Sequence, residues 1–316
     1  MRLEIVTPHH LPALVSIWNA ACGDDLAINE RLMTYNTRPA TGAIQFGRVA
    51  VENDQPVGFV IACALPNDPQ TAPRDLGWID ALAVTPAFQR RGVGGALLAS
   101  AEAWLHEQGC ARVRLGGGLH YFLPGYPVAL NGVSFFQTRG YAPRPAESQV
   151  CDLARDLRDC ATMQRSNDAT TRPAQPTDAD AILDFLRREF PGRWRFEFEE
   201  FLRERGRFAD YLLLETARGL QGVARMTRED SERPIERFYP HRLPHPWGQI
   251  GSIGISRDAR GKGYGGALLD AGLRHMRAQG VRGCIIDWTS LVELYRKFGF
   301  TPYRWYAMLI KNEQMK

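Results

Sequence analysis

Two short segments of this chain combine glycine with arginine or lysine at the same spacing, as anion-binding turns do. The segments are Gln89-Arg90-Arg91-Gly92-Val93-Gly94-Gly95 and Arg260-Gly261-Lys262-Gly263-Tyr264-Gly265-Gly266. Glycine leaves the backbone amides at a helix start uncovered, and these amides carry the positive end of the helix dipole. Because flanking cations add to that field, the ligand that suits such a turn is a phosphate or pyrophosphate. The sequence therefore predicts two sites for a phosphate-bearing ligand.

Each turn stands between a β-rich run and an amphipathic helical pattern. A short β-rich run with apolar Ile79, Leu82 and Val84 precedes the first turn, and Pro86 ends that run. After the turn, apolar residues recur at helical spacing up to Gly109, which suits a helix C-cap. The second copy repeats this order 171 positions later, where Gly280 corresponds to Gly109. Both turns are thus expected between a strand and a helix.

Two other phosphate-binding motifs do not fit these turns. A loop for nucleoside triphosphates requires G-x-x-x-x-G-K-[ST], which neither copy contains. A dinucleotide fingerprint requires a third glycine where the first copy has Leu97.

Both segments resemble the Q/R-x-x-G-x-G/A signature of the GNAT N-acetyltransferase superfamily. The resemblance covers nearly the whole chain and implies acetyl-CoA as the cofactor, with its pyrophosphate held by the turn. It also implies that the preceding strand pairs through its backbone with the pantetheine arm, at Leu82 and Val84 in the first copy and at Ile253 and Ile255 in the second. Two-domain members of the superfamily, such as mycothiol synthases and glucosamine N-acetyltransferases, have a similar arrangement.

The resemblance implies an α/β (α+β) fold with two consecutive GNAT domains, each a mixed, mostly antiparallel sheet of six to seven strands flanked by helices. A polar stretch at 165–171 marks the boundary, so we predict domains at 1–165 and 168–316. The first domain has 12 additional residues, in a long loop at 116–131. The glycines, aromatics and prolines of this loop are typical either of side chains aimed at a ligand or of a packed surface loop.

In the resembling family the general acid is a tyrosine that precedes a G-F pair by four residues. Tyr295 matches that position in the second copy, whereas Phe136 occupies it in the first. Because phenylalanine has no proton to give, this difference favours the second domain as the catalytic one. The alternative for Tyr295 is an ordinary aromatic residue of an amphipathic helix.

The sequence indicates the general base less clearly than the general acid. Asp287 ends an apolar run where the strands should separate, but it suits equally a cap for a helix that begins near Ser290. The first copy has the opposite pattern: Asp80 lies on its strand, and its acid would have to be Tyr121 or Tyr126. Activity in the first domain therefore stays open.

These residues predict transfer of acetyl from acetyl-CoA to a primary amine of a small molecule, by direct attack in a ternary complex. An amino sugar is one candidate acceptor, and the aromatic segment 238–247 could line its pocket or be a structural loop. One alternative is an acyl-CoA-binding or sensing module with one or both domains inactive. Another is a protein lysine acetyltransferase, although the loops at 119–127 and 238–247 suggest a covered acceptor site.

Composition excludes several other classes. A net charge of +4 is too small and too dispersed for a nucleic-acid partner, and neither the six cysteines nor the seven histidines show metal-ligand spacing. The chain has no apolar run of 18 residues and no signal-peptide pattern at its start. We therefore expect a soluble cytoplasmic protein, either a monomer or a homodimer, with no metal and no membrane partner.

Overall fold

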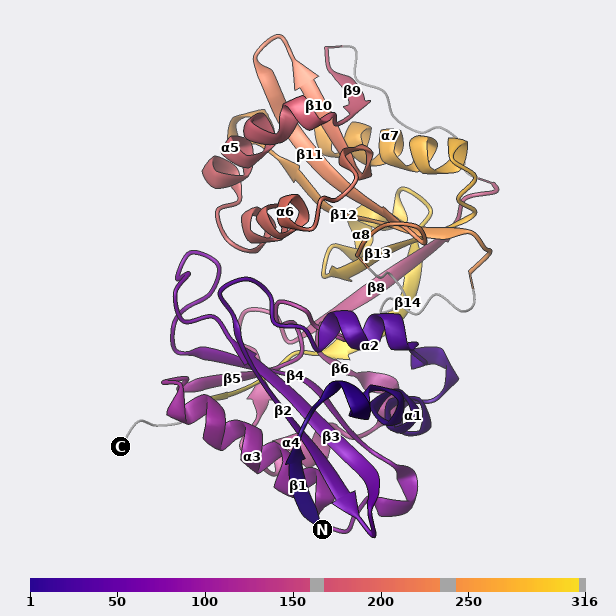
Figure 1. Cartoon of the computed structure of the whole chain (residues 1–316). Helices are drawn as coiled ribbons and strands as arrows, with labels where there is room; N and C mark the ends of the chain where they lie inside the picture. Colours follow the sequence, from indigo (N-terminus) through magenta and orange to yellow (C-terminus); the bar gives the residue numbers. More distant parts are fainter. Residues whose placement is uncertain (160–167, 234–242, 313–316) are drawn as a thin grey trace. The chain divides into compact units, whose positions relative to one another are not determined.

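The computed structural model describes residues 1–159, 168–233 and 243–312, which form two compact units (Figure 1). Unit 1 comprises Met1–Val150 and Arg304–Lys316, and unit 2 comprises Cys151–Tyr303. Each unit contains a mixed sheet flanked by helices, so the predicted α/β class is confirmed.

The sheet of unit 1 has seven strands among the described residues. In spatial order they are β1 (Arg2–Ile5), β2 (Ile44–Glu52), β3 (Gln55–Ala64), β4 (Leu76–Val84), β5 (Arg112–Leu115), β15 (Leu309–Asn312) and β7 (Ala142–Pro143). The helices are α1 (Leu11–Cys22), α2 (Glu30–Asn36), α3 (Val93–Glu107) and α4 (Val133–Gln137). Neighbouring strands are antiparallel except for β4 and β5, which are parallel.

The second sheet has eight strands among the described residues. In spatial order they are β6 (Tyr126–Pro127), β14 (Thr301–Ala307), β8 (Gln149–Asp156), β13 (Gly283–Thr289), β12 (Trp247–Ile255), β11 (Gly219–Arg228), β10 (Tyr211–Thr216) and β9 (Thr170–Pro173). The helices are α5 (Ala179–Glu189), α6 (Arg193–Arg203), α7 (Tyr264–Ala278) and α8 (Val292–Arg296). The prediction of at most seven strands is wrong here, because β6 in the loop at 116–131 pairs with β14.

Two strands make the units differ from the predicted domains 1–165 and 168–316. Strand β8 pairs with β13, with Ala154 opposite Ile285, and most of its residues belong to unit 2. Strand β15 follows all of unit 2 in the chain but pairs with β5, with Lys311 opposite Val113. The first sheet is therefore completed by residues that the sequence pattern assigns to the second domain.

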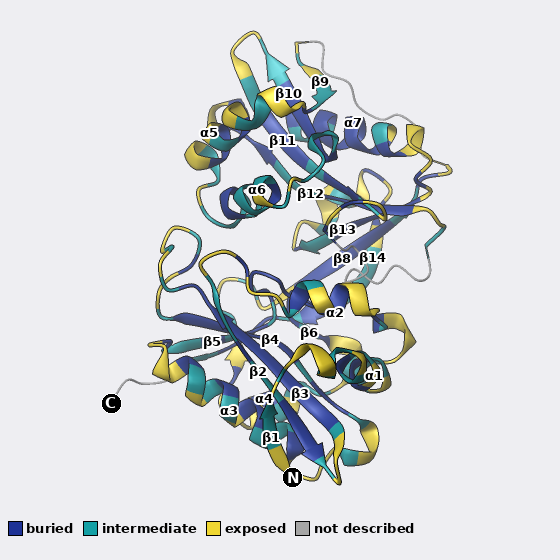
Figure 2. Ribbon diagram, in the orientation of Figure 1, coloured by how far each residue is buried: buried dark blue, intermediate teal, exposed yellow. Residues whose placement is uncertain are grey.

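The helix after each turn packs its apolar stripe on its own sheet. Leu97, Ala101 and Leu105 of α3 are fully buried, as are Leu268 and Met276 of α7. Figure 2 shows the resulting pattern, with buried strands and with helices that are exposed on their outer faces. This packing anchors the start of each helix beside the strand that precedes it.

The loop at 116–131 is folded into unit 1. Gly116 and Gly117 both have φ of 68°, and the Gly117 N–H donates to the Leu123 carbonyl at 2.9 Å. Residues 117–125 are buried, so this part of the loop is packed into unit 1. Positive φ at two successive residues explains the glycines, because other residue types adopt this conformation only at a cost.

Candidate active site

Both predicted turns are open cradles at a helix start. Gly92 and Gly263 are the N-caps of α3 and α7, with φ of 88° and 81°. A Cβ atom at Gly92 would meet no atom within 4 Å among the described residues. The first hydrogen bond of each helix runs from Ala96 to the Gly92 carbonyl at 3.0 Å and from Ala267 to the Gly263 carbonyl at 3.1 Å.

The amides before those first donors therefore have no partner within their own helix. They belong to residues predicted to bind the cofactor: Val93, Gly94 and Gly95 in α3, and Tyr264, Gly265 and Gly266 in α7. Because the positive end of the helix dipole lies at the same place, each turn fits a pyrophosphate group.

The first residue of each signature holds its turn against the preceding strand. The Gln89 side-chain amide donates to the Val84 carbonyl at 2.9 Å, and Arg260 Nε donates to the Ile255 carbonyl at 3.2 Å. The two bonds are equivalent between the copies. Gln89 and Arg260 thus shape the turn, which explains why this position takes either residue type.

The turn residues after the first position differ in type between the two copies. Arg90 has φ of 59°, and its counterpart Gly261 has φ of 80°, so both turns need a left-handed residue here. Arg91 and Lys262 are exposed, where their charge can reach a phosphate. The side chain of Tyr264 is buried, and its hydroxyl donates to Asp168 at 2.6 Å, so only its backbone belongs to the cradle.

In each unit the two parallel strands separate beside the turn. Strands β4 and β5 pair as far as Ile79 and Leu115. Strand β4 then continues through Leu82 and Val84 without β5 beside it. Strands β12 and β13 pair as far as Gln249 and Ile285, and β12 continues through Ile253 and Ile255. The backbone that is left without a parallel neighbour can pair with an extended ligand.

Tyr295 and Asp287 lie close enough to interact in unit 2. Burial raises the pKa of Tyr295 to about 12, and the charge of Asp287 adds to this shift. Asp287 accepts a short hydrogen bond from the side-chain amide of Gln249, a buried residue of β12. Both predicted catalytic residues therefore stand at the separation of β12 and β13.

Helix α8, which carries Tyr295, begins at Val292, and its N-cap is Leu291. The side chain at its approach is that of Thr289, whose hydroxyl accepts from the Leu291 N–H at 3.0 Å. The bond that Asp287 accepts from Gln249 directs its carboxylate along the sheet.

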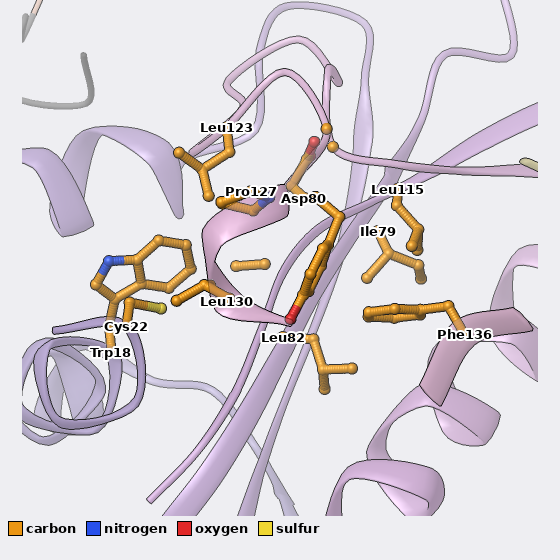
Figure 3. Close-up of a pocket in the computed structure, with 14 residues that line it drawn as sticks. Trp18, Cys22, Ile79, Asp80, Leu82, Leu115, Leu123, Pro127, Leu130 and Phe136 are labelled. Carbon is orange, nitrogen blue, oxygen red and sulfur yellow. The ribbon is translucent and has the colours of Figure 1, made fainter. Parts of the chain in front are cut away.

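Unit 1 has a pocket of about 70 Å³ at the corresponding separation of its strands (Figure 3). Trp18 of α1 and Phe136 of α4 stand on opposite sides of this pocket, and Asp80 of β4 also lines it. Asp80 is buried, and its Oδ1 accepts from the Gly118 N–H at 3.0 Å. Tyr126 is a further lining residue, and burial raises its pKa.

The structure thus brings Asp80 and Tyr126 into one pocket, whereas the backbone carbonyl of the buried Tyr121 accepts from Asn36 at 2.7 Å. Sequence reasoning missed Gln249, Trp18 and Cys22. Gln249 could have been found from its place two positions before Gly251, on the same face of its strand. For Trp18 and Cys22 the sequence offers no such signal, because α1 is distant in the chain from the strands that it meets.

Several other predictions concern surfaces and metals. Residues 238–242 of the predicted acceptor segment and Cys160 lie outside the described residues. Within the described ranges, no group of three or more His, Cys, Asp or Glu side chains is arranged to hold a metal ion. In the same ranges no helix is both long enough and apolar enough to cross a membrane.

Comparison with known proteins identifies the family. The acetyltransferase (GNAT) family matches residues 11–120 and 179–300. Mycothiol acetyltransferase from Thermobispora bispora is 27% identical over 96% of this chain and 97% of that protein. Mycothiol acetyltransferase from Paenarthrobacter aurescens is 35% identical over 24% of this chain, and the match spans 26% of that relative's length.

Solved structures show the same fold. The glucosamine N-acetyltransferase region of a fungal multi-domain β-N-acetylglucosaminidase has a TM-score of 0.87 at 20% identity, covering 98% of this chain and 38% of that one. A tandem GNAT protein from the clavulanic acid biosynthesis pathway has a TM-score of 0.69 at 15% identity, with both chains fully covered. Because the family model matches both halves of the sequence, this chain belongs to the acetyltransferase (GNAT) family, with two family domains in tandem.

Proposed function

We propose that the chain transfers an acetyl group from acetyl-CoA to a primary amine of a small molecule, and that unit 2 carries out the reaction. The observation that supports this proposal is the electrostatic interaction of Tyr295 with Asp287, which lies on β13 just after the pairing of β12 with β13 ends. A carboxylate and a phenol in one place supply the base and the acid that amide formation from a thioester requires.

The donor would be held by backbone groups and by surface cations. The amides of residues 264–266 and the side chain of Lys262 suit the pyrophosphate, and the backbone at Ile253 and Ile255 suits the pantetheine arm. The same parts in unit 1 are the amides of residues 93–95, with Arg90 and Arg91, and the backbone at Leu82 and Val84. Acetyl-CoA supplies the activated acyl group.

The proposed reaction includes two proton transfers, and residues of unit 2 would carry out both. Asp287, held by Gln249, takes the proton from the acceptor nitrogen as the new N–C bond forms. Tyr295 gives its proton to the thiolate sulfur as the C–S bond breaks. Because the pKa of Tyr295 is raised to about 12, the phenol keeps its proton until that moment. The products are the N-acetyl amine and coenzyme A.

The test is the Tyr295→Phe variant of the full chain. Loss of the acid should lower kcat about 100-fold or more while the KM for acetyl-CoA stays unchanged. The measurement is thiol release in the presence of a panel of amino sugars, polyamines, amino acids and aminoglycosides. Tyr303→Phe is the matched control, because it removes a half-buried phenol from the same unit, and it should keep full turnover.

The pocket that contains Asp80 and Tyr126 favours a second candidate, in which unit 1 is the active half or a site that binds acyl-CoA without turnover. Asp80→Asn in the same assay separates these candidates. If this variant abolished turnover while Tyr295→Phe kept it, the assignment of catalysis to unit 2 would be wrong. If neither variant changed turnover, direct acid–base catalysis by these residues would be rejected.

A further inference from the structure

Unit 2 contains a cluster of arginines that the proposed reaction does not use. Arg193, Arg225 and Arg233 surround the carboxylate of Glu197, and we call these four residues the arginine cluster. Arg193 Nε lies 2.9 Å from Glu197 Oε1, and Arg233 Nη1 lies 3.6 Å from Glu197 Oε2. Burial alone would raise the pKa of Glu197, but the charges of the three arginines lower it to about 2. Glu197 is therefore ionised beside the three arginines.

Arg225 is the member whose charge is not matched. Its guanidinium lies 5.8 Å from the ring centre of Phe201 and 5.9 Å from that of Tyr211. Among the described residues it makes no ion pair and donates no side-chain hydrogen bond, and it is only partly buried. Because the guanidinium of Arg225 is partly buried and lies beside aromatic rings, its N–H donors can bind an anion.

Arg225 lies on the sheet face that carries Asp287. Arg225 of β11 is opposite Gly251 of β12, so their side-chain positions share a face. A Cβ atom at Gly251 would lie 3.4 Å from Asp287 Oδ1 and from Gln249 Nε2. Because glycine has no side chain, the space between Arg225 and Asp287 is not filled from this position.

A second contact links the arginine cluster to the same place. The Arg193 guanidinium of α6 lies 4.9 Å from the ring centre of Trp288, the residue after Asp287. The cluster therefore approaches this part of β13 from β11, which lies two strands away in the sheet, and from α6.

Unit 1 has no equivalent of Arg225. The pair Ala62–Ile79 of unit 1 corresponds to the pair Met226–Ile250 of unit 2, which places Ile61 at the position of Arg225. The cationic face is thus a property of the half that we propose to be catalytic.

We propose that the acceptor carries a carboxylate or phosphate group in addition to its amine, and that Arg225, supported by Arg193 and Arg233, binds this anion while the amine lies toward Asp287. This inference rests on the proposed function, since it names the substrate class of the same site. Guanidinium groups match the planar oxygens of carboxylates and phosphates, whereas the carboxylate of Asp287 attracts the ammonium end. An acceptor of opposite charge at its two ends would therefore enter in one orientation.

The experiment compares matched amines with the full-length protein and acetyl-CoA. Lysine against cadaverine differs by a carboxylate, and glucosamine 6-phosphate against glucosamine differs by a phosphate. We expect kcat/KM to be at least tenfold higher for the anionic member of one pair, and the pair that responds identifies the anion. Equal values within both pairs would overturn the inference and leave the proposed acetyl transfer standing.

Variants assign the preference to Arg225. Arg225→Gln should raise the KM of the amine that carries the carboxylate or phosphate at least tenfold. It should leave turnover of the matched amine without that group within about twofold, whereas Arg225→Lys should retain part of the preference. Arg228→Gln is the control on the same strand, because this side chain bonds Gln279 after α7, and it should change neither value. An Arg225→Gln variant with an unchanged preference would contradict the assignment.

Calorimetry with the coenzyme A-bound protein gives a readout that is independent of turnover. The anionic amine of the responding pair should bind to the wild type at least tenfold more tightly than to Arg225→Gln. Equal binding, or no binding of either anionic amine, would overturn the inference. If the anionic amine bound in this way but no amine released thiol, the proposed function would fail while the anion site stood.

Discussion

Asp287 has a second effect in unit 2 besides offering a base, because its charge acts on the phenol of Tyr295. Burial is the larger cause of the raised pKa of Tyr295, and the Asp287 carboxylate is the other. A phenol with a pKa near 12 remains a proton donor across the range in which amines lose their protons. In the proposed acid–base pair, the charge of one residue therefore helps to keep the other protonated.

Removing the carboxylate should lower the pKa of Tyr295. In Asp287→Asn we expect this pKa to fall below about 12 but to stay above the ordinary value of 10.0, because burial remains. Alkaline difference titration of phenolate absorbance against the Tyr295→Phe variant measures it. Asp156→Asn removes an exposed carboxylate of β8 that is paired with Arg158, and this control should leave the pKa of Tyr295 unchanged. An unchanged value in Asp287→Asn would show that the two groups do not interact.

The same shift links stability to pH. The folded pKa of Tyr295 lies above its unfolded value, so the contribution of this residue is fully present below pH 10.0. It is lost as the pH rises through about 12, because the unfolded chain ionises first and the folded chain holds its proton.

At the scale of an element, the start of α7 depends on the left-handed conformation of Gly263. An alanine at this N-cap costs about 1 kcal/mol in backbone strain and shifts the first amides of α7. We therefore expect Gly263→Ala to raise the KM for acetyl-CoA about fivefold or more. Gly261→Arg is the matched control, since it copies Arg90, which adopts φ of 59° at the equivalent position. A KM that rose equally in both variants would contradict a specific role for Gly263.

Local pattern was enough to predict the elements that bear the turns. Glycine spacing predicted the N-caps of α3 and α7, and helical periodicity predicted the faces that they bury, because both are properties of consecutive residues. The register between the two copies located Tyr295, whose proximity to Asp287 the structure then revealed. In the same way, Asp80 was placed on its strand, but its pocket depends on α1 and on the buried loop.

The arginine cluster shows why other parts of the site could not be predicted. Its members come from α6, from β11 and from the segment after β11, and nothing in the linear spacing of residues 193, 225 and 233 brings them together. Only the packing of α6 on β10 and β11 creates that proximity. Strand β15 escaped prediction for a similar reason, since four residues cannot indicate which of two similar sheets they will join.

At the scale of the whole molecule, unit 1 depends on residues that follow unit 2 in the chain. Leu309 and Ile310 of β15 are buried in the first sheet, between β5 and β7. A chain that stops at Met308 should lose at least about 3 kcal/mol of stability in unit 1, because this apolar surface is lost and the edge of β5 is left unpaired.

Urea denaturation, with hydrogen exchange at the amides of β5, tests this expectation. A chain that stops at Asn312 keeps β15 and is the control, so it should match the full chain. Unchanged exchange at β5 in the shorter chain would show that β15 contributes little to the first sheet.

The position of β15 also bears on how the protein is made. A ribosome releases residues 1–150 first, but the sheet that they form lacks an interior strand until residue 312 has left the exit tunnel. During the synthesis of the whole intervening unit, the edge of β5 stands open to pairing with other nascent chains. The half of the protein that is synthesised first is therefore the last to fold completely. The yield of folded protein in a cell should depend on how well the edge of β5 is protected from pairing with other chains until β15 is made.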